Sequence, residues 1–170
     1  MTRRQRLRRV AILCCHCLRN LAFYRAWHQA GKPRSAEQFW VTANGNFLDV
    51  AVLEWCKLFG EPRGKHNWAK VVTDAGVFKA GLLQRLAITD AALNSYVSEM
   101  RTYRDKFVAH LDDELQMQIP NLTIAKKSAV HLYAYLLANE DDGNTFHDAP
   151  ANPNGFYRHF LAEARLVYTQ

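Results

Sequence analysis

The sequence lacks several features by which protein classes are commonly recognised. No stretch approaches about 18 uninterrupted apolar residues, so we expect no transmembrane helix and no membrane partner. There is no glycine-rich phosphate loop, no paired-cysteine zinc motif and no Ser/His/Asp arrangement that the sequence can support. No stretch has the pattern of a strand pair, and no internal repeat is present. These absences argue against a membrane protein, a protein with a glycine-rich phosphate loop, a paired-cysteine zinc protein and a β-sheet fold.

The chain has little excess of positive charge outside its first nine residues, although its net charge is +6. Five of the 22 basic residues are Arg3, Arg4, Arg6, Arg8 and Arg9. The other 17 face 16 acidic residues, so the body of the chain is nearly neutral. We therefore expect no domain-wide nucleic-acid surface. Residues 1–9 are expected to form a basic N-terminal turn or arm, which is either a solvated helix start or a phosphate contact.

The placement of the cysteines argues against a disulfide framework. The four cysteines are Cys14, Cys15, Cys17 and Cys56. Neighbours on a helix point about 100° apart, so the first three cannot easily pair with one another. The Cys14–Cys17 segment resembles a metal ligand set, but no second ligand pair with zinc spacing follows, and we predict no metal. Buried thiols that act as small apolar side chains, in a reduced cytoplasmic protein, are the favoured interpretation.

The apolar residues recur with a helical period along nearly the whole chain. At 170 residues the length suits a single domain spanning residues 1–170. A stripe of apolar residues predicts a long first helix ending near residues 31–33, and further helical segments are expected over residues 36–59, 67–72, 77–88, 91–110, 120–139 and 155–168. Residues 140–153 are expected to form a loop. The predicted fold is all-α, a bundle of about five main helices.

An arginine and a histidine near the end of one predicted helix are the best candidates for chemistry. Arg104 offers a planar set of donors for a phosphate oxygen, and His110 can move a proton near neutral pH. On a straight helix the two side chains point about 120° apart and lie about 9 Å apart along the axis. On one straight helix the two side chains cannot contact a single atom. A second copy of the chain across a two-fold axis can bring its arginine and histidine next to those of the first. Tyr103 and Lys106 share a helix face with His110 and are candidate supporting residues.

The segment 103–112, Tyr-Arg-Asp-Lys-Phe-Val-Ala-His-Leu-Asp, resembles the HEPN superfamily, whose hallmark is an Arg-polar-(x)n-His motif in a helical bundle. The sequence of this segment is similar to that of the abortive-infection AbiU-like branch of the family. Two further blocks fit this branch, namely residues 47–59 and His66-Asn67-Trp68. The resemblance spans about residues 20–140 and is most specific around the motif.

The resemblance implies a metal-independent endoribonuclease that needs no cofactor, acts as a homodimer and serves as a toxin or phage-defence effector. Arg104 would stabilise the pentacoordinate phosphate, and His110 would act as general base or acid. Asp105 is a further supporting candidate and occupies the polar position after the arginine, where many relatives have Asn. It would orient Arg104 or His110, but it also places negative charge near an anionic substrate. RNA, a second copy of the chain and an antitoxin protein are the implied partners. The alternative is a catalytically inactive HEPN-like module that binds RNA, a nucleotide or a protein.

The remaining candidates have a structural alternative beside the functional one. His66, Asn67 and Trp68 are candidate RNA-binding residues, because an aromatic ring can stack on a base. A tryptophan in a helical bundle is more often part of the core. Arg104 can likewise serve as an ion-pair partner, and His110 as a cation at a helix C-terminus.

Overall fold

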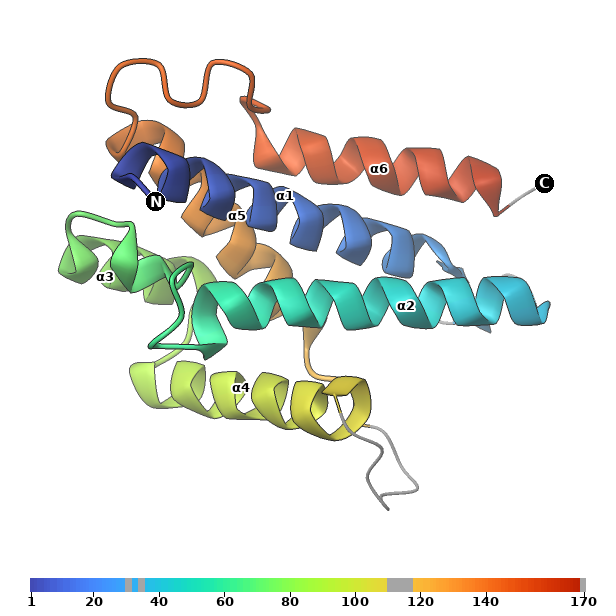
Figure 1. The fold of residues 1–170 in the computed structure, drawn as a ribbon. Helices are drawn as coiled ribbons and strands as arrows, with labels where there is room; N and C mark the ends of the chain where they lie inside the picture. Colours follow the sequence, from blue (N-terminus) through green and yellow to red (C-terminus); the bar gives the residue numbers. More distant parts are fainter. Residues whose placement is uncertain (30–31, 34–35, 110–117, 169–170) are drawn as a thin grey trace.

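A computed structural model describes residues 1–29, 32–33, 36–109 and 118–168 of the chain (Figure 1). The described residues form six α-helices, so the all-α prediction is confirmed and the number of main helices is slightly larger than the expected five or so. The helices are α1 (Arg3–Ala26), α2 (Gln38–Trp55), α3 (Ala75–Leu86), α4 (Asp90–Tyr103), α5 (Leu122–Asn139) and α6 (Pro153–Val167).

Shorter segments connect these helices. Two of them are π-helical, η1 (Cys56–Gly60) after α2 and η3 (Arg104–Ala109) after α4. A 3-10 turn, η2 (Trp68–Lys70), precedes α3, and the two-residue strands β1 (His28–Gln29) and β2 (Lys32–Pro33) pair antiparallel after α1. The predicted loop before α6 matches the irregular segment between α5 and α6.

Polar residues fix where the helices begin. Thr2 and Gln5 form a reciprocal capping box at the start of α1, so the basic residues 3–9 are the first two turns of that helix. Thr89 caps α4 by accepting a hydrogen bond from the Ala92 N–H at 3.2 Å. Asn121 and Asn152 cap α5 and α6 in the same way. These side chains satisfy backbone donors that would otherwise lack partners.

Helix α1 lies at the centre of the bundle and packs against α2, α5 and α6 (Figure 1). Its predicted apolar stripe is buried at Leu7, Val10, Cys14, Cys17 and Leu21. Helices α2 and α5 are joined by one buried polar contact, in which the Trp55 indole N–H donates to the Ser128 hydroxyl at 2.8 Å. None of the described helices combines the length and the hydropathy needed to cross a bilayer.

The four cysteines are free thiols placed as apolar side chains. Cys14, Cys17 and Cys56 are fully buried, and Cys15 is half-buried. Burial raises the pKa of Cys15 to about 11 and that of Cys56 to about 12, so both remain protonated at neutral pH. Among the described residues no three His, Cys, Asp or Glu side chains are grouped so as to hold a metal ion.

Candidate functional site

Arg104 is the first residue of η3, at the point where α4 changes from α-helical to π-helical geometry. Met100 and Tyr103 are buried on the core face of α4, and this anchoring fixes the direction of the helix end. The Arg104 side chain is only 16% exposed. Single π turns inside helices occur frequently at functional sites, because they redirect side chains locally.

Two carboxylates hold the Arg104 guanidinium. Its Nη1 lies 2.8 Å from Glu61 Oε1, and its Nε and Nη2 each lie 2.8 Å from Asp105 Oδ1. The hydrogen bond to Asp105 raises the pKa of Arg104 further above its ordinary high value. Within the described part of the chain these contacts occupy three of the five N–H groups that an arginine carries. The guanidinium is thus fixed in place with donors left for another acceptor.

Glu61 reaches Arg104 because it directly follows η1, the π-helical end of α2. The Gly64 N–H donates to the Glu61 carbonyl at 2.8 Å and closes a tight turn. Gly60 lies against the Arg101 side chain, since a Cβ at residue 60 would come within 3.3 Å of Arg101 Cγ. The two π-helical segments therefore meet through a carboxylate that follows one and a guanidinium that begins the other.

A surface hollow of about 410 Å³ lies beside this ion pair, and we refer to it as the arginine hollow. Its lining residues are Gly60, Glu61, Pro62, Arg63, Gly64, Arg101 and Arg104. Three of these lining residues are arginines and one is a glutamate. Such a charge balance favours anions, and arginine suits phosphate oxygens in particular. Glu61, Arg63 and Arg101 were not among the residues predicted from the sequence, although the spacing of Arg101 and Arg104 places both on one helix face.

Tyr103, a predicted supporting residue, faces the neighbouring helix. It is buried, and its hydroxyl donates to Asp49 Oδ1 on α2 at 3.1 Å. Burial raises the pKa of both Asp49 and Tyr103, and the neighbouring Asp49 raises that of Tyr103 further. Tyr103 and Lys106 line a different hollow, of about 500 Å³, together with Phe107. The structure therefore places these two residues beside a separate space from the one that Arg104 lines.

His110, the other predicted catalytic residue, lies outside the described residues. Ala109, the last residue of η3, precedes it in the sequence. The π-helical geometry of η3 also departs from the straight helix on which the 120° separation of Arg104 and His110 was based.

The predicted RNA-binding segment 66–68 has clear roles in the fold. Asn67 is buried, and its side chain caps η2 by accepting from the Ala69 N–H at 3.1 Å. Trp68 stacks on Phe78 with ring centroids 4.8 Å apart. Burial lowers the pKa of His66, and the positive charges of Arg9, Lys57 and Arg6 lower it further. His66 thus faces the basic start of α1, while Asn67 and Trp68 support the segment that leads into α3.

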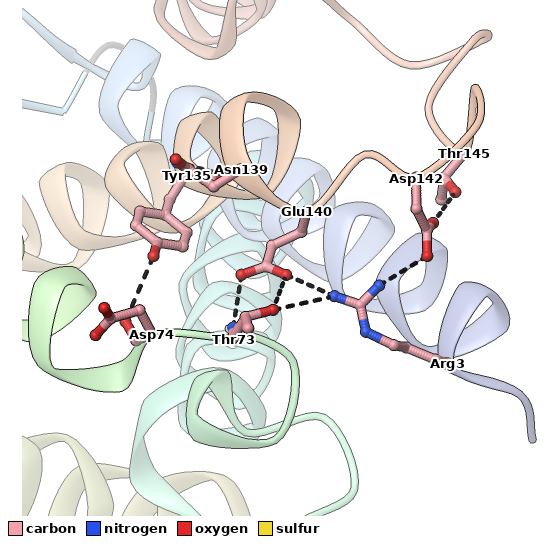
Figure 2. A network of polar contacts seen from close by, with 8 residues as sticks. All are labelled: Arg3, Thr73, Asp74, Tyr135, Asn139, Glu140, Asp142 and Thr145. Atoms are coloured by element: carbon pink, nitrogen blue, oxygen red, sulfur yellow. Dashed lines mark hydrogen bonds and ion pairs between the residues drawn. The ribbon is translucent and has the colours of Figure 1, made fainter.

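The basic start of α1 is bound to the loop after α5 (Figure 2). Arg3 contacts the carboxylates of Glu140 and Asp142, the latter at 3.0 Å. Arg8 contacts Asp148 at 2.7 Å and also donates to the Thr145 carbonyl at 2.7 Å. Two of the five N-terminal arginines are therefore engaged by acidic groups of the protein itself. The sequence contained a signal for this pairing, because the loop carries several carboxylates and the helix start carries none.

Comparisons with protein-family models, curated proteins and solved structures gave no match for this chain. We therefore infer the function from the residues and their geometry.

Proposed function

We propose that this protein is a metal-independent endoribonuclease of the HEPN type, which acts in the cytoplasm as a toxin or phage-defence effector. The observation that carries the proposal is the placement of Arg104. Its largely buried guanidinium is fixed by Glu61 and Asp105 at the start of η3 and beside an anion-favouring hollow. His110 follows Arg104 by six positions in the sequence, as the Arg-polar-(x)n-His motif requires.

In this reaction the RNA supplies its own nucleophile. The ribose 2′-hydroxyl attacks the adjacent phosphorus, the bond from phosphorus to the 5′-oxygen breaks, and the products carry a 2′,3′-cyclic phosphate and a 5′-hydroxyl. His110 takes the 2′-hydroxyl proton or gives a proton to the leaving oxygen. Arg104 stabilises the additional negative charge on the pentacoordinate phosphorus, and its fixed position means that little reorganisation is needed.

The proposed site combines residues of two copies of the chain. The resemblance to HEPN proteins implies a homodimer, and a facing copy can supply a histidine to the phosphate that Arg104 contacts. The proposed partners are RNA, a second copy of the chain and an antitoxin protein that restrains the activity.

A second candidate function is a catalytically inactive HEPN-like module that binds RNA, a nucleotide or a protein. The observation that favours it is the pair of carboxylates on Arg104, which partly neutralises the group that would stabilise the phosphate. A phosphate must compete with, or add to, these two contacts.

The test is cleavage of a labelled mixed-sequence RNA in excess EDTA. The wild type is compared with His110→Ala and Arg104→Ala, and His159→Ala serves as the matched histidine control, because His159 is 71% exposed on α6. We expect cyclic-phosphate products from the wild type and from His159→Ala, with losses of at least about 100-fold in the other two variants. Cleavage that survives His110→Ala unchanged contradicts the proposal.

The same variants separate the two candidate functions. A folded wild type that binds RNA without cutting it, with binding unaffected by His110→Ala, supports the inactive module. Cleavage that requires both Arg104 and His110 eliminates the module.

A further inference from the structure

We propose that the arginine hollow binds a phosphate group through Arg63 and Arg101, beside Arg104. With RNA as the source of that phosphate, the inference rests on the proposed function and adds a subsite to it. Arg63 and Arg101 are positioning residues in this proposal: they hold the strand through a phosphate other than the one that reacts.

The walls of the hollow place the three arginines around one space. Arg101 and Arg104 are three residues apart, at the end of α4 and the start of η3, so their side chains leave the same face. Arg63 also lines the hollow and lies in the turn that the Gly64 N–H closes. The aliphatic part of Arg101 passes over Gly60, and this close approach is the reason that a residue without a side chain suits position 60.

The charges around the hollow are unevenly compensated. Arg104 is engaged by Glu61 and Asp105. Among the residues that the structure describes, neither Arg63 nor Arg101 forms an ion pair, and both are exposed. Exposed arginines that line one hollow repel one another, and an anion bound between them relieves that repulsion. A phosphate satisfies this arrangement, because each guanidinium can donate two parallel hydrogen bonds to its oxygens.

The measurement is the binding of a short single-stranded 2′-O-methyl RNA as a function of salt. The methyl group blocks the attacking hydroxyl, so binding is measured without cleavage. The test variant is Arg63→Gln/Arg101→Gln. The matched control is Arg85→Gln/Arg158→Gln, which removes the same charge from two other exposed arginines, on α3 and α6. Circular dichroism and thermal unfolding confirm that both variants are folded.

We expect the test variant to lower the slope of log Kd against log salt by about 0.7, because the two arginines share one phosphate and each phosphate contact to a single strand contributes about 0.7. At about 0.15 M salt this corresponds to a Kd about fourfold weaker. The control should change the slope by less than half as much. In a cleavage assay the test variant should raise KM and leave kcat unchanged, because its residues do not touch the reacting atoms.

A parallel titration with inorganic phosphate and a nucleoside 5′-monophosphate identifies the source of the phosphate. Weaker RNA binding by the test variant assigns the site to the RNA backbone. If the variant weakens only binding of the free phosphate compounds, the site takes a mononucleotide or phosphate ion. If all ligands bind the test variant and the control equally, the proposal is overturned. Failure of the nuclease proposal is distinguishable, because it shows as absent cleavage while the dependence of 2′-O-methyl RNA binding on Arg63 and Arg101 persists.

Discussion

The Glu61 carboxylate and the Arg104 guanidinium form a 2.8 Å ion pair that joins the π-helical ends of α2 and α4. The Glu61 side chain is 45% exposed, whereas that of Arg104 is 16% exposed. Glu61 therefore does two opposing things. It orients the arginine, and it places the one negative charge inside the arginine hollow.

Replacing Glu61 with Gln should strengthen phosphate binding, because an uncharged amide still accepts a hydrogen bond but no longer repels the ligand. We expect the Kd for 2′-O-methyl RNA to fall about two- to fivefold at moderate salt. The free energy of unfolding should change by less than about 1 kcal/mol, since the pair is partly exposed to solvent. Glu163→Gln on α6 is the control, and weaker binding by Glu61→Gln would contradict the assignment of the hollow as an anion site.

Asp105 offers a second test of how negative charge limits the site. In Asp105→Asn the side-chain oxygen remains available to Arg104, while the charge next to the anionic substrate is removed. We expect kcat/KM for RNA cleavage to rise about three- to tenfold. Steady-state kinetics on one RNA substrate measure the effect. A fall in kcat/KM would show instead that the Asp105 charge is needed to hold the arginine.

We predict that Glu140, at the C-terminal end of α5, is a main structural link to the start of α1 and to the segment before α3. Its side chain is 1% exposed and accepts hydrogen bonds from the Thr73 N–H at 2.6 Å and the Thr73 hydroxyl at 2.7 Å, in addition to its contact with Arg3 (Figure 2). Glu140→Ala leaves the Thr73 donors without this acceptor. We expect a loss of about 2 kcal/mol in the free energy of unfolding, measured by urea denaturation.

The exposed Glu163 is the control for this substitution, because its contact with His159 is long, at 3.7 Å. Glu163→Ala should change the free energy of unfolding by less than about 0.5 kcal/mol. Equal losses in the two variants would remove Glu140 from this structural role.

The sequence predicts the helices of this fold far better than the contacts of its site. The stripe from Leu7 to Leu21 identifies α1 because its period follows from local helix geometry. The Arg104–Glu61 pair joins residues 43 positions apart, and the Arg3–Glu140 pair joins residues 137 positions apart. No local rule determines such pairings. The prediction of a continuous helix over 91–110 also missed the change at Arg104, since π-helical hydrogen bonding depends on what the segment packs against.

The stability of the fold should depend on pH through His131. Burial lowers the pKa of this residue, and its Nε2 lies 3.2 Å from the Phe78 carbonyl oxygen, so the neutral ring donates to that oxygen. Because the folded-state pKa lies below the unfolded value, the unfolded chain binds the proton more readily. The contribution is fully present above about pH 6.5 and is lost as the pH falls toward the folded-state pKa.

The measurement is urea denaturation of the wild type and His131→Gln between about pH 8 and 5. We expect the variant to lose less stability than the wild type on acidification, whatever its stability at pH 8. His66, whose pKa is lowered in the same direction, remains in both proteins, so only the difference between them is assigned to His131. His159→Gln is the exposed control and should follow the wild type. Parallel curves for wild type and His131→Gln would exclude His131 as a source of the pH dependence.

Mixing two inactive variants tests whether the proposed site is shared between copies. Arg104→Ala and His110→Ala are denatured together and refolded, which yields mixed dimers alongside the parent ones. If each site takes its arginine from one copy and its histidine from the other, a mixed dimer retains one intact pair, and cleavage reappears at about a quarter of the wild-type rate. If both residues come from the same copy, no dimer has an intact pair and the mixture stays inactive. A mixture of Arg104→Ala with Arg104→Ala/His159→Ala is the control, and it should show no recovery because every dimer lacks the arginine.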